Sequence, residues 1–192
     1  GLMSYTLPEI SAMISSTHDR DWPDIQIGVS PYSMVTSSSD KPEAGRGQTE
    51  QEPGLTIAGF FLRPHSEGIV ELASSDSAVP PSVDPNWLGD PRDQIAARRL
   101  FDMLRRFVAQ PALADYVGAE IVPGAQVQSD DQIEQAIRWL LSPGLHGTGT
   151  CRMGDPHDSV VDERLRVHGV AKLRVVDCSV MPTTVSGNTN GP

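Results

Sequence analysis

The sequence predicts an α+β domain, because strand-like runs and helical runs are segregated along the chain and do not alternate. Short apolar runs typical of strands lie mainly before residue 90. Two longer segments between residues 90 and 142 carry apolar residues at helical spacing. The chain has 16 Pro and 17 Gly among 192 residues, which predicts many turns between these elements.

Composition and charge exclude several classes of protein. Hydrophobic residues make up 38% of the chain, which is enough for a packed core. No apolar run approaches the roughly 20 residues that span a bilayer, so no membrane span is expected. The net charge of −10 disfavours a nucleic-acid partner. Two cysteines do not form a disulfide framework, and we expect a reducing, cytoplasmic location.

The first half of the chain contains the expected strands. Apolar residues alternate with polar or small ones over residues 25–29, which is typical of a half-buried strand. The apolar run 55–62 predicts a buried strand, and residues 69–72 are expected to be its hairpin partner. Between the first two strands, residues 35–54 are rich in Ser, Gly, Pro and Glu, and predict a mobile surface loop. The proline-rich stretch 78–91 predicts an extended connection.

Two helices follow, each with a recognisable start. Asp90 is the expected N-cap of the first helix, Pro91 occupies its first position, and Pro111 ends it. Ser129 and Gln132 have the spacing of a capping box for the second helix, which stops before Pro143-Gly144. Four arginines of the first helix are expected to form a solvated face: Arg98, Arg99, Arg105 and Arg106. Beyond the helices, residues 160–161, 165–167 and 173–176 predict short strands.

The first segment dense in chemical groups is residues 145–154, where His146 lies on a turn among glycines, threonines and Cys151. A structural loop histidine and a functional one are both open from these residues alone. The glycines do not have the spacing of a dinucleotide-phosphate loop. Neither a cysteine nucleophile at Cys151 nor a zinc site has its usual local pattern. The zinc site would draw on His146, Cys151, Asp155 and His157.

The second such segment is residues 175–190. An apolar strand is expected to end at Asp177, with Cys178 as a small buried residue, and Pro182 turns the chain. Asn188 lies in a Gly-Asn turn, and its amide offers both a donor and an acceptor.

Together, the two segments resemble the C-terminal part of the glucose–methanol–choline (GMC) oxidoreductases. The matching stretches, in the order and spacing of that family, are His146 to Gly154, Asp162 to Gly169, Leu173 to Pro182 and Ser186 to Asn190. Weaker similarity extends upstream to the family's substrate-binding domain. The resemblance implies an antiparallel or mixed sheet with helices packed on one side, in a substrate-binding domain over residues 1–142. Residues 143–192 would form a C-terminal catalytic segment that completes the flavin domain.

The resemblance also implies an activity, the oxidation of a small-molecule alcohol by hydride transfer from the carbinol carbon to N5 of FAD. His146 matches the family's general base, and Asn188 matches a residue that orients the substrate hydroxyl. Asp177, Cys178, Asn188 and Thr189 match positions that contact the flavin. Arg152 is expected to pair with an acidic neighbour. No metal ligand is implied.

The chain departs from the family in what it contains. Neither the Gly-rich fingerprint of the family's N-terminal FAD-binding domain nor its last helix is found in these 192 residues. We therefore expect a fragment that is inactive alone and whose partner is the missing domain, in the same polypeptide or a separate chain. Two other interpretations stay open: a lyase or other flavoenzyme of the superfamily, and a non-catalytic module that has lost the flavin domain.

Overall fold

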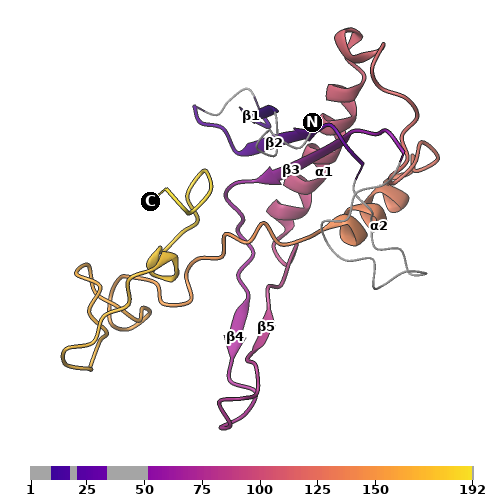
Figure 1. Ribbon diagram of the computed structural model, residues 1–192. Coiled ribbons are helices and arrows are strands. Elements are labelled where there is room, and N and C mark those ends of the chain that lie inside the picture. The colour runs from indigo at the N-terminus through magenta and orange to yellow at the C-terminus, as the bar shows by residue number, and fades with distance from the viewer. Residues whose placement is uncertain (1–9, 18–20, 34–51, 192) are drawn as a thin grey trace. The chain divides into compact units, whose positions relative to one another are not determined.

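The computed structural model describes residues 10–17, 21–33 and 52–191 (Figure 1). Contacts divide the chain into two units, which are described separately. The first unit comprises residues 1–60 and 99–137, and the second comprises residues 61–98 and 138–192. Helix α1, Pro91–Val108, contributes its first turns to the second unit and its remaining turns to the first. Most of the loop expected at residues 35–54 lies outside the described residues.

The first unit contains a three-stranded sheet of order β1-β2-β3. Its strands are β1, Ile10–Ile14, β2, Ile25–Ser30, and β3, Thr56–Phe61. Strands β1 and β2 are antiparallel, with Ile10 opposite Val29 and Ile14 opposite Ile25. The central strand provides the core, since Ile25 and Ile27 are only 1% and 2% exposed. The alternation that predicted β2 is confirmed, whereas β1 was not predicted.

The chain between β1 and β2 is held by a nearly buried carboxylate. Asp24 is 7% exposed, and its two oxygens accept hydrogen bonds from the backbone N–H and the hydroxyl of Ser16, each at 2.6 Å. Buried polar groups are stable only when they are hydrogen-bonded in this way. This interaction fixes the point at which the chain enters β2.

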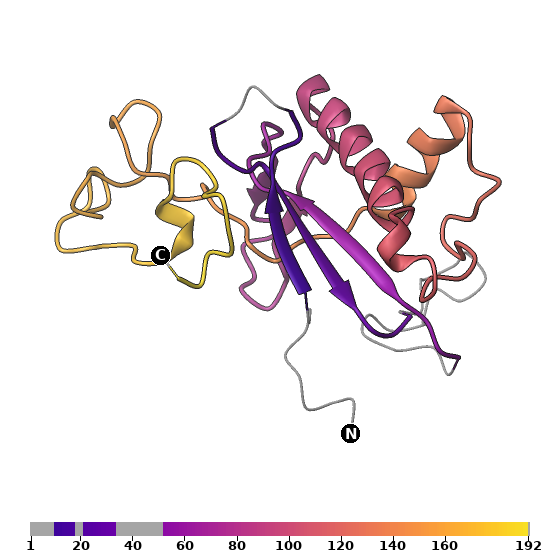
Figure 2. The ribbon, with the colours of Figure 1, turned by 90° about the horizontal axis from the view of Figure 1, so that it is seen from above.

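Strand β3 forms where the apolar run 55–62 predicted a strand, but the expectation that it would be buried is wrong. Its residues are half-buried or exposed. Helix α1 lies against β3 (Figure 2), but β3 is at the edge of the sheet and so has a neighbouring strand on one side only. Leu100 of α1 lies directly over Gly59, where the lack of a side chain lets the helix approach the strand. The predicted α+β class, with antiparallel strands and two helices, is confirmed.

Both predicted helix starts are confirmed. Asp90 caps α1, with the backbone N–H of Arg92 donating to its Oδ1 at 2.8 Å, and α1 ends three residues before Pro111. Helix α2, Asp130–Leu140, begins with the predicted capping box. The backbone N–H of Gln132 donates to Ser129 Oγ at 3.3 Å, and Gln132 Oε1 accepts from the backbone N–H of Ser129 at 3.1 Å. Ile133 and Ala136 of α2 are buried.

The solvated basic face predicted for α1 requires a correction at Arg105. Its guanidinium lies 4.6 Å from the ring centroid of Phe101 and pairs with Glu120 at 2.8 Å. It also donates to the carbonyl oxygen of Val127 at 2.8 Å. Arg105 therefore ties the connection between the helices to α1, because one planar guanidinium can satisfy several acceptors at once. That connection begins with a short 3₁₀ turn, Pro111–Leu113.

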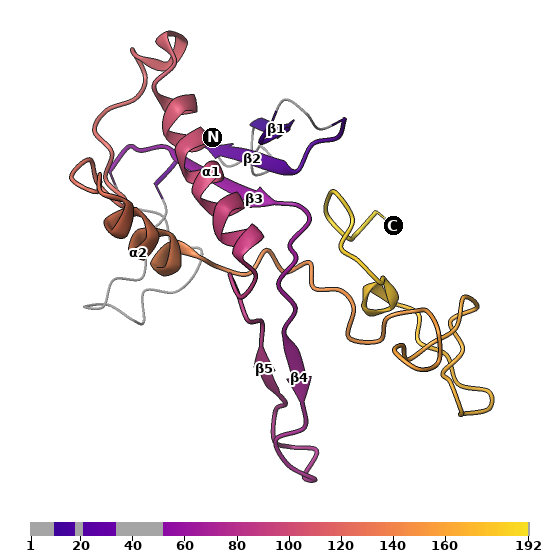
Figure 3. The same ribbon diagram turned by 180° about the vertical axis from the view of Figure 1, so that it is seen from behind.

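The second unit contains a two-stranded antiparallel ribbon of β4, Ile69–Glu71, and β5, Ser82–Asp84 (Figure 3). Val70 is opposite Val83. The prediction that residues 69–72 would pair with 55–62 is therefore wrong, and the stretch 78–91 is not only an extended connection. The prolines of that stretch flank β5 without interrupting it, so the chain can turn back on β4.

The C-terminal part of the second unit is built from turns joined by single bridges. Val161 is fully buried at its centre and bridges both Met153 and Val167, and a further bridge joins Arg166 to Arg174. The three short strands expected over residues 160–176 are thus reduced to isolated bridges. Residues Cys178–Val180 form a 3₁₀ turn, so the prediction that Cys178 is a buried residue at a strand end is wrong.

The contact between Gly59 and Leu100 can be tested with Gly59→Ala. The added Cβ would lie 2.4 Å from Cδ1 of Leu100, which is 7% exposed and has little room to move. We expect the free energy of unfolding, measured by urea titration, to fall by about 1–3 kcal/mol.

Gly118→Ala serves as the control, because a Cβ at Gly118 would meet no atom within 4 Å and the change should stay within about 0.5 kcal/mol. In a Leu100→Ala background the cost of Gly59→Ala should largely vanish. An unchanged cost there would show that the contact with Leu100 is not its cause.

Candidate active site

His146 lies on a turn shortly after α2, where Pro143 and Gly144 have ended the helix. The preceding Leu145 has a φ of 61°, a left-handed conformation that is unusual for a residue with a side chain. The imidazole is half-buried, and its Nδ1 lies 3.2 Å from the hydroxyl of Thr189. A Cβ on Gly147 would meet no atom within 4 Å, so the chain beside His146 is open.

The two segments singled out in the sequence lie alongside each other. The backbone N–H of Cys151 donates to the carbonyl of Ser179 at 3.0 Å, and that of Met153 donates to Val180 at 2.9 Å. Farther along, the hydroxyls of Thr148 and Thr184 are 3.0 Å apart. Residues 146–154 and 178–189 are therefore in register, and the structure brings His146 and Thr189 together.

Asn188 precedes Thr189 in the turn 186–190 and is exposed. Its amide and its backbone N–H make no hydrogen bond to any residue that the structure describes, and the same holds for the backbone N–H of Thr189. The turn thus offers several unused donors beside His146.

Asp177 and Cys178 begin the same segment but make no hydrogen bond to His146, Asn188 or Thr189 within the described ranges. Asp177 caps the 3₁₀ turn by accepting from the backbone N–H of Ser179 at 2.8 Å. Hydrogen bonds from the Ser179 side chain, and then from its backbone, lower the pKa of Asp177 below its ordinary value. Asp177 is therefore held as an exposed anion.

Two charged residues that the sequence analysis did not assign to the site also contact it. Arg63 donates from Nε to the hydroxyl of Ser186 at 2.5 Å, and Arg152 pairs with Glu67 at 3.1 Å. The second contact confirms the expected acidic partner of Arg152. Arg63 and Glu67 lie in the upstream part of the chain, where the sequence showed only weaker family resemblance and did not indicate which residues they contact.

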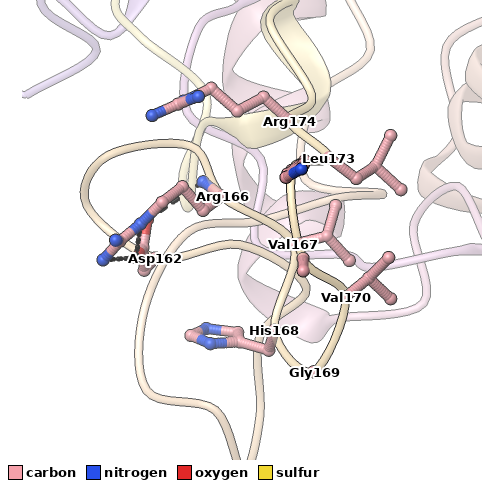
Figure 4. A pocket seen from close by; sticks show the side chains of 10 residues that line it. Asp162, Arg166, Val167, His168, Gly169, Val170, Leu173 and Arg174 are labelled. Carbon is pink, nitrogen blue, oxygen red and sulfur yellow. Dashed lines mark hydrogen bonds and ion pairs between the residues drawn. The ribbon is translucent and has the colours of Figure 1, made fainter.

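A hollow of about 420 Å³ lies elsewhere, between the turns of residues 162–174 (Figure 4). Three of its charged groups are already engaged, since Arg166 pairs with Asp162 at 2.6 Å and Arg174 Nε donates to the carbonyl of Arg164 at 3.2 Å. None of the predicted site residues lines it. We therefore place the candidate site at His146 and the turn 186–190, and not at this hollow.

Neither a metal centre nor a membrane helix is found in the parts of the chain that the structure describes. No group of three or more His, Cys, Asp or Glu side chains there could hold a metal ion. No helix in those parts is both long enough and apolar enough to cross a bilayer.

Similarity to known proteins defines the class to which this chain belongs. The chain belongs to the GMC oxidoreductase family, whose family model matches residues 64–192. That range contains α1, α2 and both segments of the candidate site. The family resemblance drawn from the motifs is thereby confirmed.

Two curated relatives show the similarity over nearly the whole chain. An alcohol dehydrogenase (acceptor) of Pseudomonas putida is 36% identical over 192 residues, which cover 100% of this chain and 33% of the relative. An oxygen-dependent choline dehydrogenase of Yersinia pseudotuberculosis is 36% identical over 182 residues, or 95% of this chain and 31% of the relative. The chain thus spans about a third of the length of the relatives it matches.

Solved structures share the fold. Pyridoxine 4-oxidase from Mesorbium loti superposes with a TM-score of 0.79 at 25% identity, covering 93% of this chain and 34% of that protein. An FAD-dependent oxidoreductase from Chaetomium thermophilum superposes with a TM-score of 0.65 at 25% identity, covering 87% and 25%. The similarity therefore extends over both units.

The ion pair between Asp162 and Arg166 leads to a prediction about pH. Hydrogen bonds from Arg166, chiefly from its side chain, lower the pKa of Asp162 from 3.8 to about 2. Asp162 therefore stabilises the fold above pH 3.8, and this contribution is lost as the pH falls through about 2. In Arg166→Gln we expect the pKa, measured by carboxyl ¹³C NMR, to rise toward 3.8.

Arg164→Gln is the matched control, because Arg164 contributes only its backbone N–H to Asp162 and the substitution keeps that group. Its carboxyl titration should match that of the unmodified protein. A pKa that stays low in Arg166→Gln would contradict the assigned cause.

Proposed function

We propose that this chain is the substrate-binding and C-terminal part of an FAD-dependent oxidoreductase that acts on the CH–OH group of a small alcohol. The FAD-binding domain would belong to the same polypeptide or to a separate chain. The observation that carries the proposal is the contact of His146 Nδ1 with Thr189 Oγ1, which leaves the other ring nitrogen, Nε2, for a substrate. Family membership and the FAD-dependent structural relative support it.

The groups in the turn 186–190 fit a flavin by the chemistry of their donors. The backbone N–H groups of Asn188 and Thr189 have no partner among the described residues, and a flavin ring carries carbonyl oxygens and nitrogens that accept such bonds. The same turn lies beside the imidazole. Asn188 and Thr189 would hold the ring there, and Asp177 and the backbone of Cys178 would contact the flavin elsewhere. A bound FAD would supply the acceptor, at N5, for the hydride of the carbinol carbon.

His146 takes the hydroxyl proton. Neutral imidazole is a suitable base near neutral pH. In the tautomer that this role requires, Nδ1 carries the proton and donates to Thr189 Oγ1. The lone pair is then on Nε2, and this nitrogen accepts the proton of the alcohol. The alcohol oxygen then carries more negative charge, which favours departure of hydride from the adjacent carbon. The imidazolium formed at His146 stabilises that charge.

Asn188 orients the alcohol. Its amide is exposed and makes no hydrogen bond within the described part of the chain, so its NH₂ can donate to the substrate oxygen. A bond from this side fixes the direction in which the hydroxyl proton points, toward Nε2 of His146. Orientation of this kind lowers the entropic part of the barrier.

The proposal as a whole is tested by adding alcohols to the flavin-loaded protein without oxygen. A panel of alcohols should include at least one that bleaches the flavin absorbance, which shows that the flavin has accepted two electrons. A flavin that no alcohol reduces would contradict the oxidoreductase assignment and favour a lyase or another use of the flavin.

For His146→Ala, we expect the rate of flavin reduction by alcohol to fall by roughly 10²- to 10⁴-fold, the usual range for loss of a general base. Flavin content should stay near normal, because His146 is not among the groups proposed to hold the flavin. Anaerobic stopped-flow absorbance measures the rate, and flavin absorbance after gel filtration measures the content. A folded variant with an unchanged rate would exclude the base role.

The role of Asn188 is tested by comparing Asn188→Asp with Asn188→His. Histidine keeps a donor, whereas an ionised aspartate cannot donate and places negative charge beside the developing oxyanion. One lost hydrogen bond in a closed site corresponds to about 5- to 150-fold in rate, and charge repulsion adds to it for aspartate. We therefore expect Asn188→Asp to be slower than Asn188→His in flavin reduction at saturating alcohol.

The opposite order of rates, with Asn188→Asp faster than Asn188→His, would indicate a structural role for Asn188. If Asn188 only forms the turn, Asp should be tolerated better than His, because Asp adopts turn conformations nearly as readily as Asn. Asn188→Asp at the unmodified rate, with Asn188→His impaired, would remove Asn188 from the catalytic residues.

A further inference from the structure

A buried carboxylate at the start of α1 holds the loop that leads into β4. Asp93 is 2% exposed and lies in the first turn of the helix. Its Oδ1 accepts from the backbone N–H of His65 at 2.9 Å, and its Oδ2 accepts from the backbone N–H of Ser66 at 2.6 Å. The hydroxyl of Ser66 donates to the same Oδ2 at 2.5 Å.

The hydrogen bonds to Asp93 offset the free-energy cost of burying its carboxylate. A carboxylate without partners is unstable in a protein interior, and Asp93 forms no ion pair within the described residues. It is stabilised by three donors and by its place at a helix N-terminus, where the helix dipole favours negative charge. Ser66 Oγ in turn accepts from the backbone N–H of Asp90 at 3.1 Å. The helix start and the loop are thereby joined as one structure.

The loop held by Asp93 contacts both segments of the candidate site. At its beginning, Arg63 donates to Ser186, two residues before Asn188. At its end, Glu67 pairs with Arg152, which belongs to the same segment as His146. All these residues lie in the second unit.

Neither contact would fix a geometry alone. The side chains of Arg152 and Glu67 are 43% and 70% exposed, and an exposed ion pair contributes only about 0–1 kcal/mol. Such a contact positions its partner only if the chain that carries it is itself rigid. The three hydrogen bonds to Asp93 supply that rigidity to residues 65 and 66, between the two contact points.

We propose that Asp93 is a positioning residue for the reaction: through Arg63 and Glu67 it sets the placement of the turn 186–190 relative to His146. The proposal rests on the proposed function, because it requires His146 and Asn188 to act on one substrate. In this proposal Asp93 acts through other residues, since it is buried and its oxygens are bonded to residues 65 and 66.

The test is Asp93→Asn in the flavin-loaded protein. The amide is the same size, but its NH₂ would face N–H donors where the carboxylate oxygen accepted them. We expect the limiting rate of flavin reduction per bound flavin to fall roughly 10- to 100-fold, since displacement of reacting groups by about 1 Å has effects of this order. Asp90→Asn is the control, because Asn caps a helix as well as Asp and the backbone N–H is kept; its rate per flavin should not change.

A double-mutant cycle with His146→Ala separates positioning from general destabilisation. If Asp93 acts by placing groups relative to His146, Asp93→Asn should change the rate less than about 2-fold once His146 is absent. The full factor persisting in that background would overturn the proposal. So would a loss of thermal stability and flavin content in Asp93→Asn with an unchanged rate per bound flavin.

The experiment distinguishes failure of the proposal for Asp93 from failure of the proposed function. An unchanged rate in His146→Ala alone would contradict the proposed function, whatever Asp93→Asn does. If Asp93→Asn does not fold, Ser66→Ala replaces it. This change removes the hydroxyl that donates to Asp93 and accepts from the backbone N–H of Asp90, and it keeps both backbone N–H donors to Asp93. It should give a smaller loss of rate with the same dependence on His146, and a loss independent of His146 would overturn the proposal.

Discussion

The pairing of residues 146–154 with residues 178–189 holds the candidate site together. Cys151 and Met153 donate to the carbonyls of Ser179 and Val180, and these two hydrogen bonds set the register between residues 146–154 and 178–189. Val161, fully buried, supports this pairing through its bridge to Met153. A change of register would separate His146 from Thr189 without altering either side chain. The chemistry proposed for the imidazole therefore depends on main-chain geometry several residues away.

The elements predicted correctly are those with a local signal. The N-cap at Asp90, the capping box of Ser129 and the alternation in β2 each depend on residues close together in the sequence. The strand that pairs with β4 could not be predicted from such a local signal. A run of three residues carries no information about which strand lies opposite, so pairing with 55–62 was as consistent with the pattern as the observed pairing with β5. Strand β1 was missed because much of its surface is exposed and its alternation is weak.

In the candidate site, too, features with a local sequence signal could be recognised, and contacts between distant residues could not. The motifs singled out His146 in one segment and Asn188 and Thr189 in the other, and the structure brings His146 and Thr189 together. The roles of these residues stay predictions. The contacts of Arg63 and Glu67 could not be predicted, since they depend on a loop fixed by Asp93, more than twenty residues away along the chain. For Asp177 and Cys178, the structure gives a 3₁₀ turn in place of the expected strand end, and their contact with a flavin stays a prediction.

The sequence separation of the contacts around Arg63 bears on how the site is assembled during folding. Arg63 and Ser186 are 123 residues apart, and Glu67 and Arg152 are 85 apart. Closing loops of this length has an entropic cost that local helices do not have, and contacts of this kind are typically made late. During synthesis, α1 and α2 can form before residue 186 has left the ribosome. A nascent chain would then present the loop 63–67, already held by Asp93, as the surface onto which the C-terminal segment folds.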